Sequence, residues 1–268
     1  MQEVTAVGER RAPGTPYLPS LPPPGSRKRL FCFHPAGGGA SVFSGLRTAL
    51  AGRVEVVGVQ LPGREGRRAH PLPATMAELV AELDSHLDPH LSGAYAFYGH
   101  SMGALVAHDL VLRRQRRRAS TPARLVAAAC RAPQRGAAFA DRAEADDQVL
   151  IRTMLDIGGL SPELLRYPDW LRAAVDLTRG DLRLCAGRES AHGELLECPV
   201  DVFHATSDPL VSETDAEAWR ERTAAACTVH RFEGGHFFFL RDCPQQFAEH
   251  LALTVLGGPQ HRSAGGAS

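Results

Sequence analysis

One short segment of the sequence, GHSMG (99–103), has the residue types that nucleophilic catalysis requires. It fits the pattern G-x-S-x-G, in which a serine sits on a sharp turn between a strand and a helix. The apolar run before it (94–98) predicts a buried strand, and the small and apolar residues after it (103–114) predict a helix. The flanking glycines suit such a turn, because a strand and a helix that pack so closely leave no space for side chains. We therefore take Ser101 as the candidate nucleophile of an acyl-transfer reaction.

Ser101 needs a base and an acid that orients the base, and the sequence offers both in the expected order. A serine hydroxyl becomes a good nucleophile only when a histidine takes its proton, and a carboxylate holds that histidine in place. Asp208 and His236 each follow an expected strand, in the chain order serine, acid, histidine of the α/β-hydrolases. Both are therefore expected at the carboxyl edge of a parallel sheet, where ligands bind in open α/β folds.

Each of these two residues also has a purely structural interpretation. Asp208 precedes Pro209, a position where aspartate commonly caps a turn. His236 is one of twelve histidines, and His100 lies directly beside the serine. Successive side chains in so tight a turn point apart, so we expect that His100 does not reach the Ser101 hydroxyl.

Two backbone amides are candidates for stabilising the oxyanion that forms during acyl transfer. One belongs to Met102, directly after the nucleophile, and the other is expected in the loop HPAGGG (34–39) after the first strand. We assign the second amide to Ala36, because Pro35 has no N–H to donate. A phosphate-binding loop is the alternative for this run of glycines, but the run fits neither G-x-G-x-x-G nor G-x-x-x-x-G-K-[ST].

The elements that must position these residues follow the pattern of an α/β protein. Short apolar runs alternate with segments of helical periodicity, which predicts a mostly parallel central sheet flanked by helices, as in the α/β-hydrolase fold. The expected strands are residues 29–34, 54–61, 94–98, 125–130, 200–204 and 228–232, and the expected helices are residues 75–91, 103–114, 213–222 and 244–256.

Residues 139–188 interrupt this alternation, because they contain helical patterns and no strand-like run. An insertion of this length between two strands commonly forms a lid over an active site. We therefore expect a helical lid insertion, with flexible joints at Gly158, Gly159 and Gly180.

The ordered part of the chain is expected to be one domain over residues 28–256. The proline-rich leader (1–27) and the tail (257–268) lack apolar periodicity, so we predict that the leader is disordered and the tail flexible.

Thirty basic residues balance thirty acidic ones, which argues against nucleic-acid and membrane partners held by charge. The six cysteines are scattered and no signal peptide is visible, which favours a cytoplasmic protein without a metal site. We also expect a monomer.

Seven segments taken together resemble the stand-alone type II thioesterases of polyketide and nonribosomal-peptide assembly lines. They are FCFHPAGGGA (31–40), QLPGREGR (60–67), YGHSMGA (98–104), GGLSPELL (158–165), LTRGDLRL (177–184), ATSDPLV (205–211) and FEGGHFFFL (232–240), and the resemblance runs from about residue 29 to 256. Medium-chain thioesterases of fatty-acid synthases resemble the same pattern. The chain departs from the family at Ala186-Gly187, where an aromatic pair is usual, which leaves the size of the acyl group open.

The resemblance implies that Ser101, Asp208 and His236 hydrolyse acyl groups from the phosphopantetheine arm of acyl or peptidyl carrier domains. In this family the reaction usually removes stalled or misprimed chains, and the insertion at 139–188 is a mobile lid over the acyl chamber. No separate cofactor is implied, because the phosphopantetheine belongs to the carrier partner. Two alternatives stay open: a carboxylesterase or lipase on the same fold, and a catalytically inactive scaffold.

Three further features favour structural roles. The turn at Arg64 and Glu65 either shapes the mouth of the site or is a structural ion pair within a tight loop, and we favour the ion pair. The arginine-rich run RRQRRR (113–118) is expected to be a solvated helix end, roughly 24 Å from the nucleophile by helical rise, rather than a docking patch for a carrier. The three phenylalanines at 237–239 are expected to pack in the core rather than to form an acyl-binding wall, although Phe237 can do both.

Overall fold

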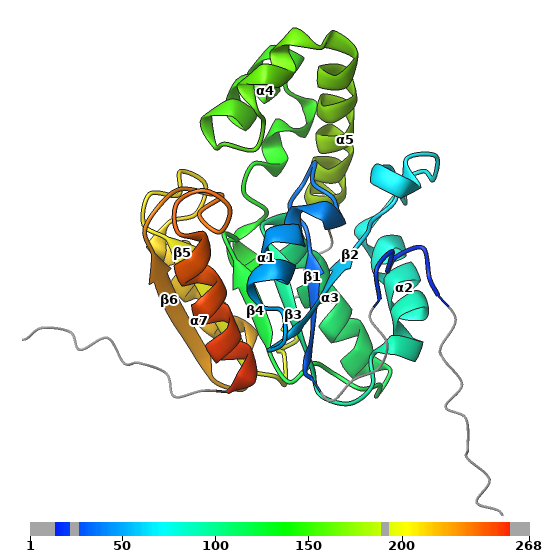
Figure 1. Cartoon of the computed structure of the whole chain (residues 1–268), viewed down its shortest axis with the longest axis vertical. Helices are drawn as coiled ribbons and strands as arrows, with labels where there is room; N and C mark the ends of the chain where they lie inside the picture. The colour runs from blue at the N-terminus through cyan, green and yellow to red at the C-terminus, as the bar shows by residue number, and fades with distance from the viewer. Residues whose placement is uncertain (1–13, 22–26, 189–192, 258–268) are drawn as a thin grey trace, which may run out of the picture.

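A computed structural model describes residues 14–21, 27–188 and 193–257, and its centre is a six-stranded sheet (Figure 1). The strands are β1 (Arg29–Phe33), β2 (Glu55–Val59), β3 (Tyr95–His100), β4 (Leu125–Ala128), β5 (Val200–Ala205) and β6 (Cys227–Phe232). Their order across the sheet is β2-β1-β3-β4-β5-β6, and each neighbouring pair is parallel. This confirms the α/β-hydrolase architecture predicted from the alternation of strands and helices.

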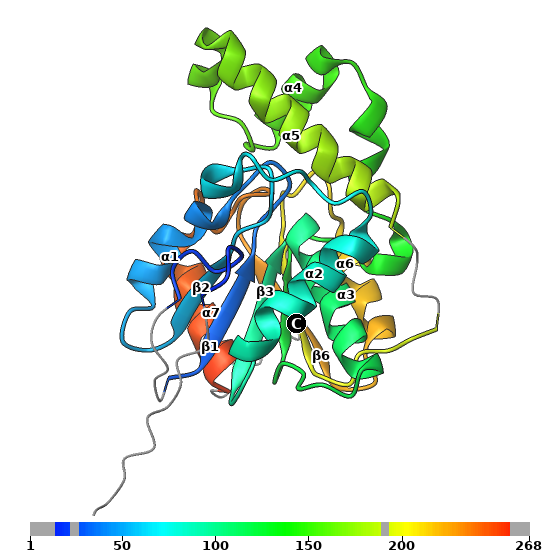
Figure 2. The ribbon, with the colours of Figure 1, turned by 90° about the vertical axis from the view of Figure 1, so that its right-hand side faces the viewer.

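Helices cover both faces of the sheet (Figure 2). One face carries α1 (Ser44–Ala49) and α7 (Pro244–Leu256), and the other carries α2 (Met76–Leu87), α3 (Met102–Arg116) and the short α6 (Glu213–Glu217). Helix α2 begins with a capping box in which Thr75 and Glu78 bind each other's backbone amides. Among the helices of the described residues, none is both long enough and apolar enough to cross a membrane.

Alternate residues of each strand face the two helical layers. In β1, Phe31 and Phe33 pack on the side of α2 and α3, while Leu30 and Cys32 pack on the side of α1 and α7. Because both faces are buried, the central strands β3 and β4 have almost no charged positions, whereas the edge strand β6 carries His230 and Arg231 and is only partly buried. The central strands therefore stand out in the sequence as short apolar runs.

Residues 139–188 form a helical insertion above the carboxyl edge of the sheet, between β4 and β5 (Figure 1). It contains α4 (Asp147–Asp156) and α5 (Pro168–Ala186); all of its residues are described and none lies in a strand. Gly158 adopts φ +78° just after α4 and ends that helix, at the position where a flexible joint is predicted. Gly180 lies inside α5, where an added Cβ would be 2.7 Å from Leu72, so the predicted joint at Gly180 is wrong.

Part of the proline-rich leader packs against the domain. Tyr17 is fully buried, its hydroxyl donates to Glu82 (2.6 Å), and its carbonyl accepts from the amide of Gln60 (2.8 Å). The guanidinium of Arg67 lies 4.0 Å from the centre of the Tyr17 ring. The expected disorder is therefore wrong for residues 14–21, because one aromatic side chain anchors them. Residues 1–13 and 22–26 of the predicted leader, and 258–268 of the predicted tail, lie outside the described residues.

One arginine at the end of α3 is buried in ion pairs, while residues 116–118 are exposed. Arg114 is 1% exposed and binds Asp84 (2.7 Å) and Asp88 (2.9 Å). Arg113 and Arg117 also bind Asp84. The expectation of a solvated helix end is therefore confirmed for residues 116–118 and wrong for Arg114, because α2 packs beside α3 and brings Asp84 to it.

Candidate active site

The candidate nucleophile Ser101 lies on a strained turn between β3 and α3. Its backbone has φ +53° and ψ −119°, a conformation that residues with a side chain rarely adopt. An added Cβ on Gly99 would lie 2.3 Å from the Gly103 carbonyl oxygen, and one on Gly103 would lie 2.0 Å from the carbonyl oxygen of Phe33. Only glycine fits at either position, which explains the spacing of the motif.

The candidate base and acid form a hydrogen-bonded pair at the carboxyl edge of the sheet. His236 Nδ1 lies 2.9 Å from Asp208 Oδ2, and the two side chains are 2% and 0% exposed. Because a carboxylate only accepts, Nδ1 carries the proton of the neutral ring and Nε2 is left as an acceptor. The other carboxylate oxygen of Asp208 accepts from the amide of Leu210 (2.9 Å), so Asp208 is also the turn cap that the sequence left open.

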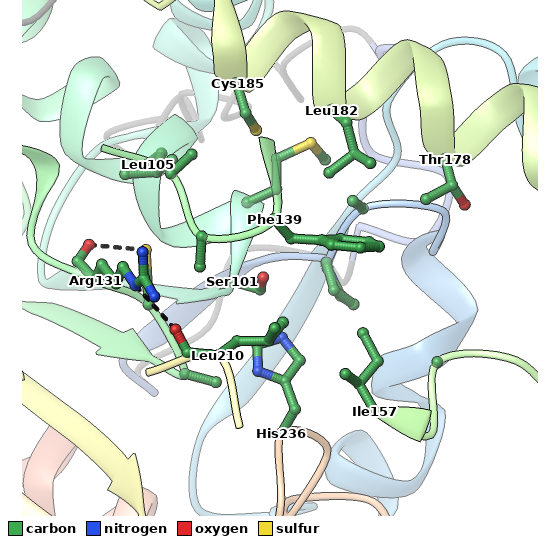
Figure 3. A pocket seen from close by; sticks show the side chains of 18 of the residues that line it. Ser101, Leu105, Arg131, Phe139, Ile157, Thr178, Leu182, Cys185, Leu210 and His236 are labelled. Atoms are coloured by element: carbon green, nitrogen blue, oxygen red, sulfur yellow. Dashed lines mark hydrogen bonds between the residues drawn. The ribbon is translucent and has the colours of Figure 1, made fainter. Parts of the chain in front are cut away.

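Loops from three strands hold this pair in place. The amide of Ser207, after β5, donates to the carbonyl of Gly234, after β6, over 2.9 Å. Arg131, after β4, donates through Nε to the carbonyl of Leu210 over 2.9 Å (Figure 3). The position of Asp208 is therefore set from both sides.

Ser101 and His236 line one pocket, which lies between the sheet edge and the helical insertion (Figure 3). The other lining residues are mostly apolar, and the cavity volume is about 40 Å³, which is room for about three water molecules. Phe139 contributes to this narrowness: its backbone has φ +71°, and in Figure 3 its ring lies between Ser101 and Leu182 of α5. The pocket as it stands is narrow and fits a small apolar group.

Both candidate oxyanion donors reach this pocket. Met102 is the first residue of α3, so its amide has no acceptor within the helix. Ala36, in the loop after β1, lines the pocket with Ser101. The next two amides of that loop are occupied, because Gly37 donates to Asp181 (2.8 Å) and Gly38 to the carbonyl of residue 35 (3.0 Å). Within this loop, the geometry thus favours the amide of Ala36 as the oxyanion donor.

His100 is buried away from the nucleophile, as expected. Its Nε2 lies 2.9 Å from the backbone carbonyl of His236, and its Nδ1 lies 3.1 Å from the Tyr98 hydroxyl. Burial, together with the nearby His236, holds the pKa of His100 well below its usual value, so the ring is neutral. Its ring stacks on Phe237, and residues 237–239 are all buried, as predicted.

The expected ion pair between Arg64 and Glu65 is wrong. Glu65 accepts from the amide of Ser41 (3.2 Å), and Arg64 makes two 2.7 Å hydrogen bonds to Asp181 of α5. Sequence reasoning missed this pair, although both residues lie in segments on which the family resemblance depended. The partner of Arg64 could not be found locally because it is 117 residues away.

Comparison with known proteins agrees with this geometry. Residues 28–253 match the thioesterase domain family. The gramicidin S biosynthesis protein GrsT of Aneurinibacillus migulanus is 30% identical over 213 residues, which cover 80% of this chain and 83% of that protein.

Solved structures of thioesterases are also similar to this chain. The thioesterase RedJ of the prodiginine pathway in Streptomyces coelicolor is 34% identical, with a TM-score of 0.77 and coverage of 84% of this chain and 85% of RedJ. The type II thioesterase BorB from the borrelidin biosynthetic cluster is 28% identical, with a TM-score of 0.73 and coverage of 93% and 96%. By the extent of the family match and the identity to its members, this chain belongs to the thioesterase family.

Proposed function

We propose that this thioesterase hydrolyses short acyl groups from the phosphopantetheine arm of acyl or peptidyl carrier domains. The carrier domains would belong to polyketide or nonribosomal-peptide assembly lines, because the similar protein ClbQ, 26% identical to this chain, is described as part of the colibactin NRPS/PKS pathway. The single observation that carries the proposal is the buried His236–Asp208 pair beside Ser101 in an apolar pocket. The pantetheine group arrives with the carrier, so the chain itself supplies only the catalytic side chains.

The reaction follows from the proton positions at this site. His236 Nε2 takes the proton of the Ser101 hydroxyl, whose oxygen attacks the thioester carbonyl carbon. The Met102 and Ala36 amides stabilise the negative oxygen that forms, and the C–S bond then breaks as His236 protonates the departing thiol. Water next attacks the acyl-serine by the same route and releases a free acid. Asp208 keeps the proton of His236 on Nδ1 throughout, so that Nε2 always faces the reaction.

The narrow pocket favours a short acyl group over the medium-chain products of a fatty-acid-synthase thioesterase. A carboxylesterase would use the same side chains, so the two activities differ only in the preferred leaving group. An inactive scaffold is disfavoured by the strained backbone at Ser101, because such strain is usually kept only where a function requires it.

Mass spectrometry of carrier domains tests the proposal directly. Carriers loaded with acetyl, propionyl and octanoyl groups should lose them on incubation with the enzyme, the short groups fastest. Ser101→Ala should leave all of them loaded, because loss of the nucleophile typically costs about six orders of magnitude in kcat. Faster hydrolysis of oxoesters than of matched thioesters would instead assign a carboxylesterase, and no hydrolysis of either would support a scaffold.

A further inference from the structure

A carboxylate in the middle of α5 joins the helical insertion to the loop that carries the candidate oxyanion donor. Asp181 is fully buried, and its Oδ2 accepts from the amide of Gly37 (2.8 Å). The same carboxylate receives both terminal nitrogens of Arg64 at 2.7 Å. Arg64 is 3% exposed and also donates to the carbonyl of Gly38 (3.2 Å). Asp181 and Arg64 together therefore hold the loop at two successive residues.

The loop and α5 are in close contact at this point. Gly37 has φ +71°, and an added Cβ there would lie 2.4 Å from the hydroxyl oxygen of Thr178, one helical turn before Asp181. Thr178 itself lines the pocket together with Ala36 and Ser101. Because Ala36 directly precedes Gly37, the restraint on Gly37 also limits how the Ala36 amide can turn.

We propose that Asp181, with Arg64, is a positioning residue that aims the Ala36 amide at the oxyanion. This inference rests on the proposed function. It extends that function to the helical insertion, because Asp181 of α5 would then help to form the catalytic site. A carboxylate bound one residue from the Ala36 amide would oppose the development of negative charge there if it were alone. The guanidinium of Arg64 balances that charge, which explains why the two residues occur as a pair.

A second buried ion pair provides a matched control for this role. Asp84 is also fully buried and binds Arg114, which is 1% exposed, over 2.7 Å. This pair joins α2 to α3. Among the described residues, neither of its members lines the pocket. Asp84→Asn and Asp181→Asn therefore both weaken a buried ion pair, but only Asp181→Asn acts on the loop after β1.

The test compares the kinetics of the two variants on an acyl thioester. Asp181→Asn should lower kcat by about 10- to 100-fold with KM within about twofold of wild type, because a misplaced amide weakens only the transition state. Asp84→Asn should lower the unfolding temperature and keep kcat. Arg64→Lys retains the charge but loses the paired nitrogens, so it should lower kcat in the same direction and serves if Asp181→Asn does not fold.

Inhibitor binding separates positioning from general damage to the fold. A trifluoromethyl ketone analogue, which forms an oxyanion on Ser101, should bind Asp181→Asn more weakly by the same factor as the loss in kcat/KM. A thioether analogue of the substrate should bind wild type and variant alike. Equal weakening of both inhibitors, or loss of activity that follows only the folded fraction measured by circular dichroism, would overturn the proposal.

The proposed function can fail independently of this inference. If wild-type enzyme hydrolyses no thioester, the function falls, but labelling of Ser101 by a fluorophosphonate still reports on the oxyanion site. Slower labelling of Asp181→Asn than of Asp84→Asn would then keep the positioning role, and equal rates would reject it.

Discussion

The backbone of the candidate nucleophile Ser101 is held in a strained conformation. A sparsely populated backbone conformation of this kind destabilises a residue with a side chain by roughly 1–3 kcal/mol, and glycine adopts positive φ more readily. Ser101 accepts this strain because the turn presents its hydroxyl at the tip between β3 and α3. The identity of this residue should therefore affect activity and stability in opposite directions.

We predict that Ser101→Gly is inactive yet more stable than Ser101→Ala by about 1 kcal/mol, since both lack the hydroxyl and only glycine relieves the strain. Urea unfolding of the two variants measures the difference. Ala104→Gly, inside α3, is the control and should lower the stability by about 1 kcal/mol. Equal stability of the two Ser101 variants would show that the turn is not strained.

Phe139, a second residue of the pocket, should limit the length of the acyl group that the enzyme accepts. Its ring occupies pocket space beside Ser101 (Figure 3). We predict that Phe139→Ala raises kcat/KM for octanoyl relative to propionyl thioesters by about tenfold or more, because each added methylene can gain burial of about 0.8 kcal/mol. Tyr167→Ala, at an aromatic residue of the insertion that is 57% exposed, is the matched control and should leave the ratio unchanged. An unchanged ratio in Phe139→Ala would place the length limit elsewhere.

The two helices of the insertion differ in how many side chains they bury. The second half of α5 carries the buried Asp181 and the buried apolar residues Leu182 and Leu184. Helix α4 buries only Leu150 and Met154 among its ten residues. Movement of a lid should therefore be confined to α4 and the segment after it, with α5 as its base.

Hydrogen exchange measures this difference. We predict that amides of residues 147–166 exchange at least about tenfold faster than those of residues 178–186, because local opening there breaks fewer buried contacts. A bound substrate analogue should slow the first segment and leave the second unchanged. Exchange at one uniform rate from 139 to 188 would mean that the insertion moves as a unit or not at all.

At the scale of the whole molecule, buried neutral histidines link stability to pH. Burial, with a smaller contribution from the charge of Arg64, lowers the pKa of His34 from 6.5 to about 3. Between these two values the unfolded chain binds one proton more than the folded chain at this position. Stability is therefore complete above about pH 6.5 and falls as the pH is lowered towards 3, by up to about 1.4 kcal/mol per pH unit for this group.

Urea unfolding between pH 7.5 and 4.5 tests the contribution of His34. We predict that the free energy of unfolding of wild type falls over this range and that His34→Asn reduces the slope, because asparagine binds no proton. The pKa of His100 is also lowered by burial, so some slope should remain in the variant. Identical slopes in wild type and variant would contradict the assignment to His34.

Local patterns in the sequence were enough to predict the sheet and to place the candidate catalytic residues along it. Buried strands stand out as apolar runs because both faces of the sheet are covered. The turn at Ser101 stands out because only glycine fits at positions 99 and 103. Asp208 and His236 could be placed because each follows a strand, and parallel strands end at one edge. In each case the structural requirement acts within a few residues, so it leaves a mark in the local sequence.

Contacts between distant segments were decided only by the tertiary structure. Arg64 binds Asp181 rather than its neighbour Glu65, and the buried Arg114 binds Asp84 of α2. Tyr17 anchors a segment whose composition indicates disorder. A charged or aromatic side chain has the same composition and spacing whichever partner it meets. Its partner depends on which elements pack side by side, and that follows from burial of the whole core, which no local pattern records.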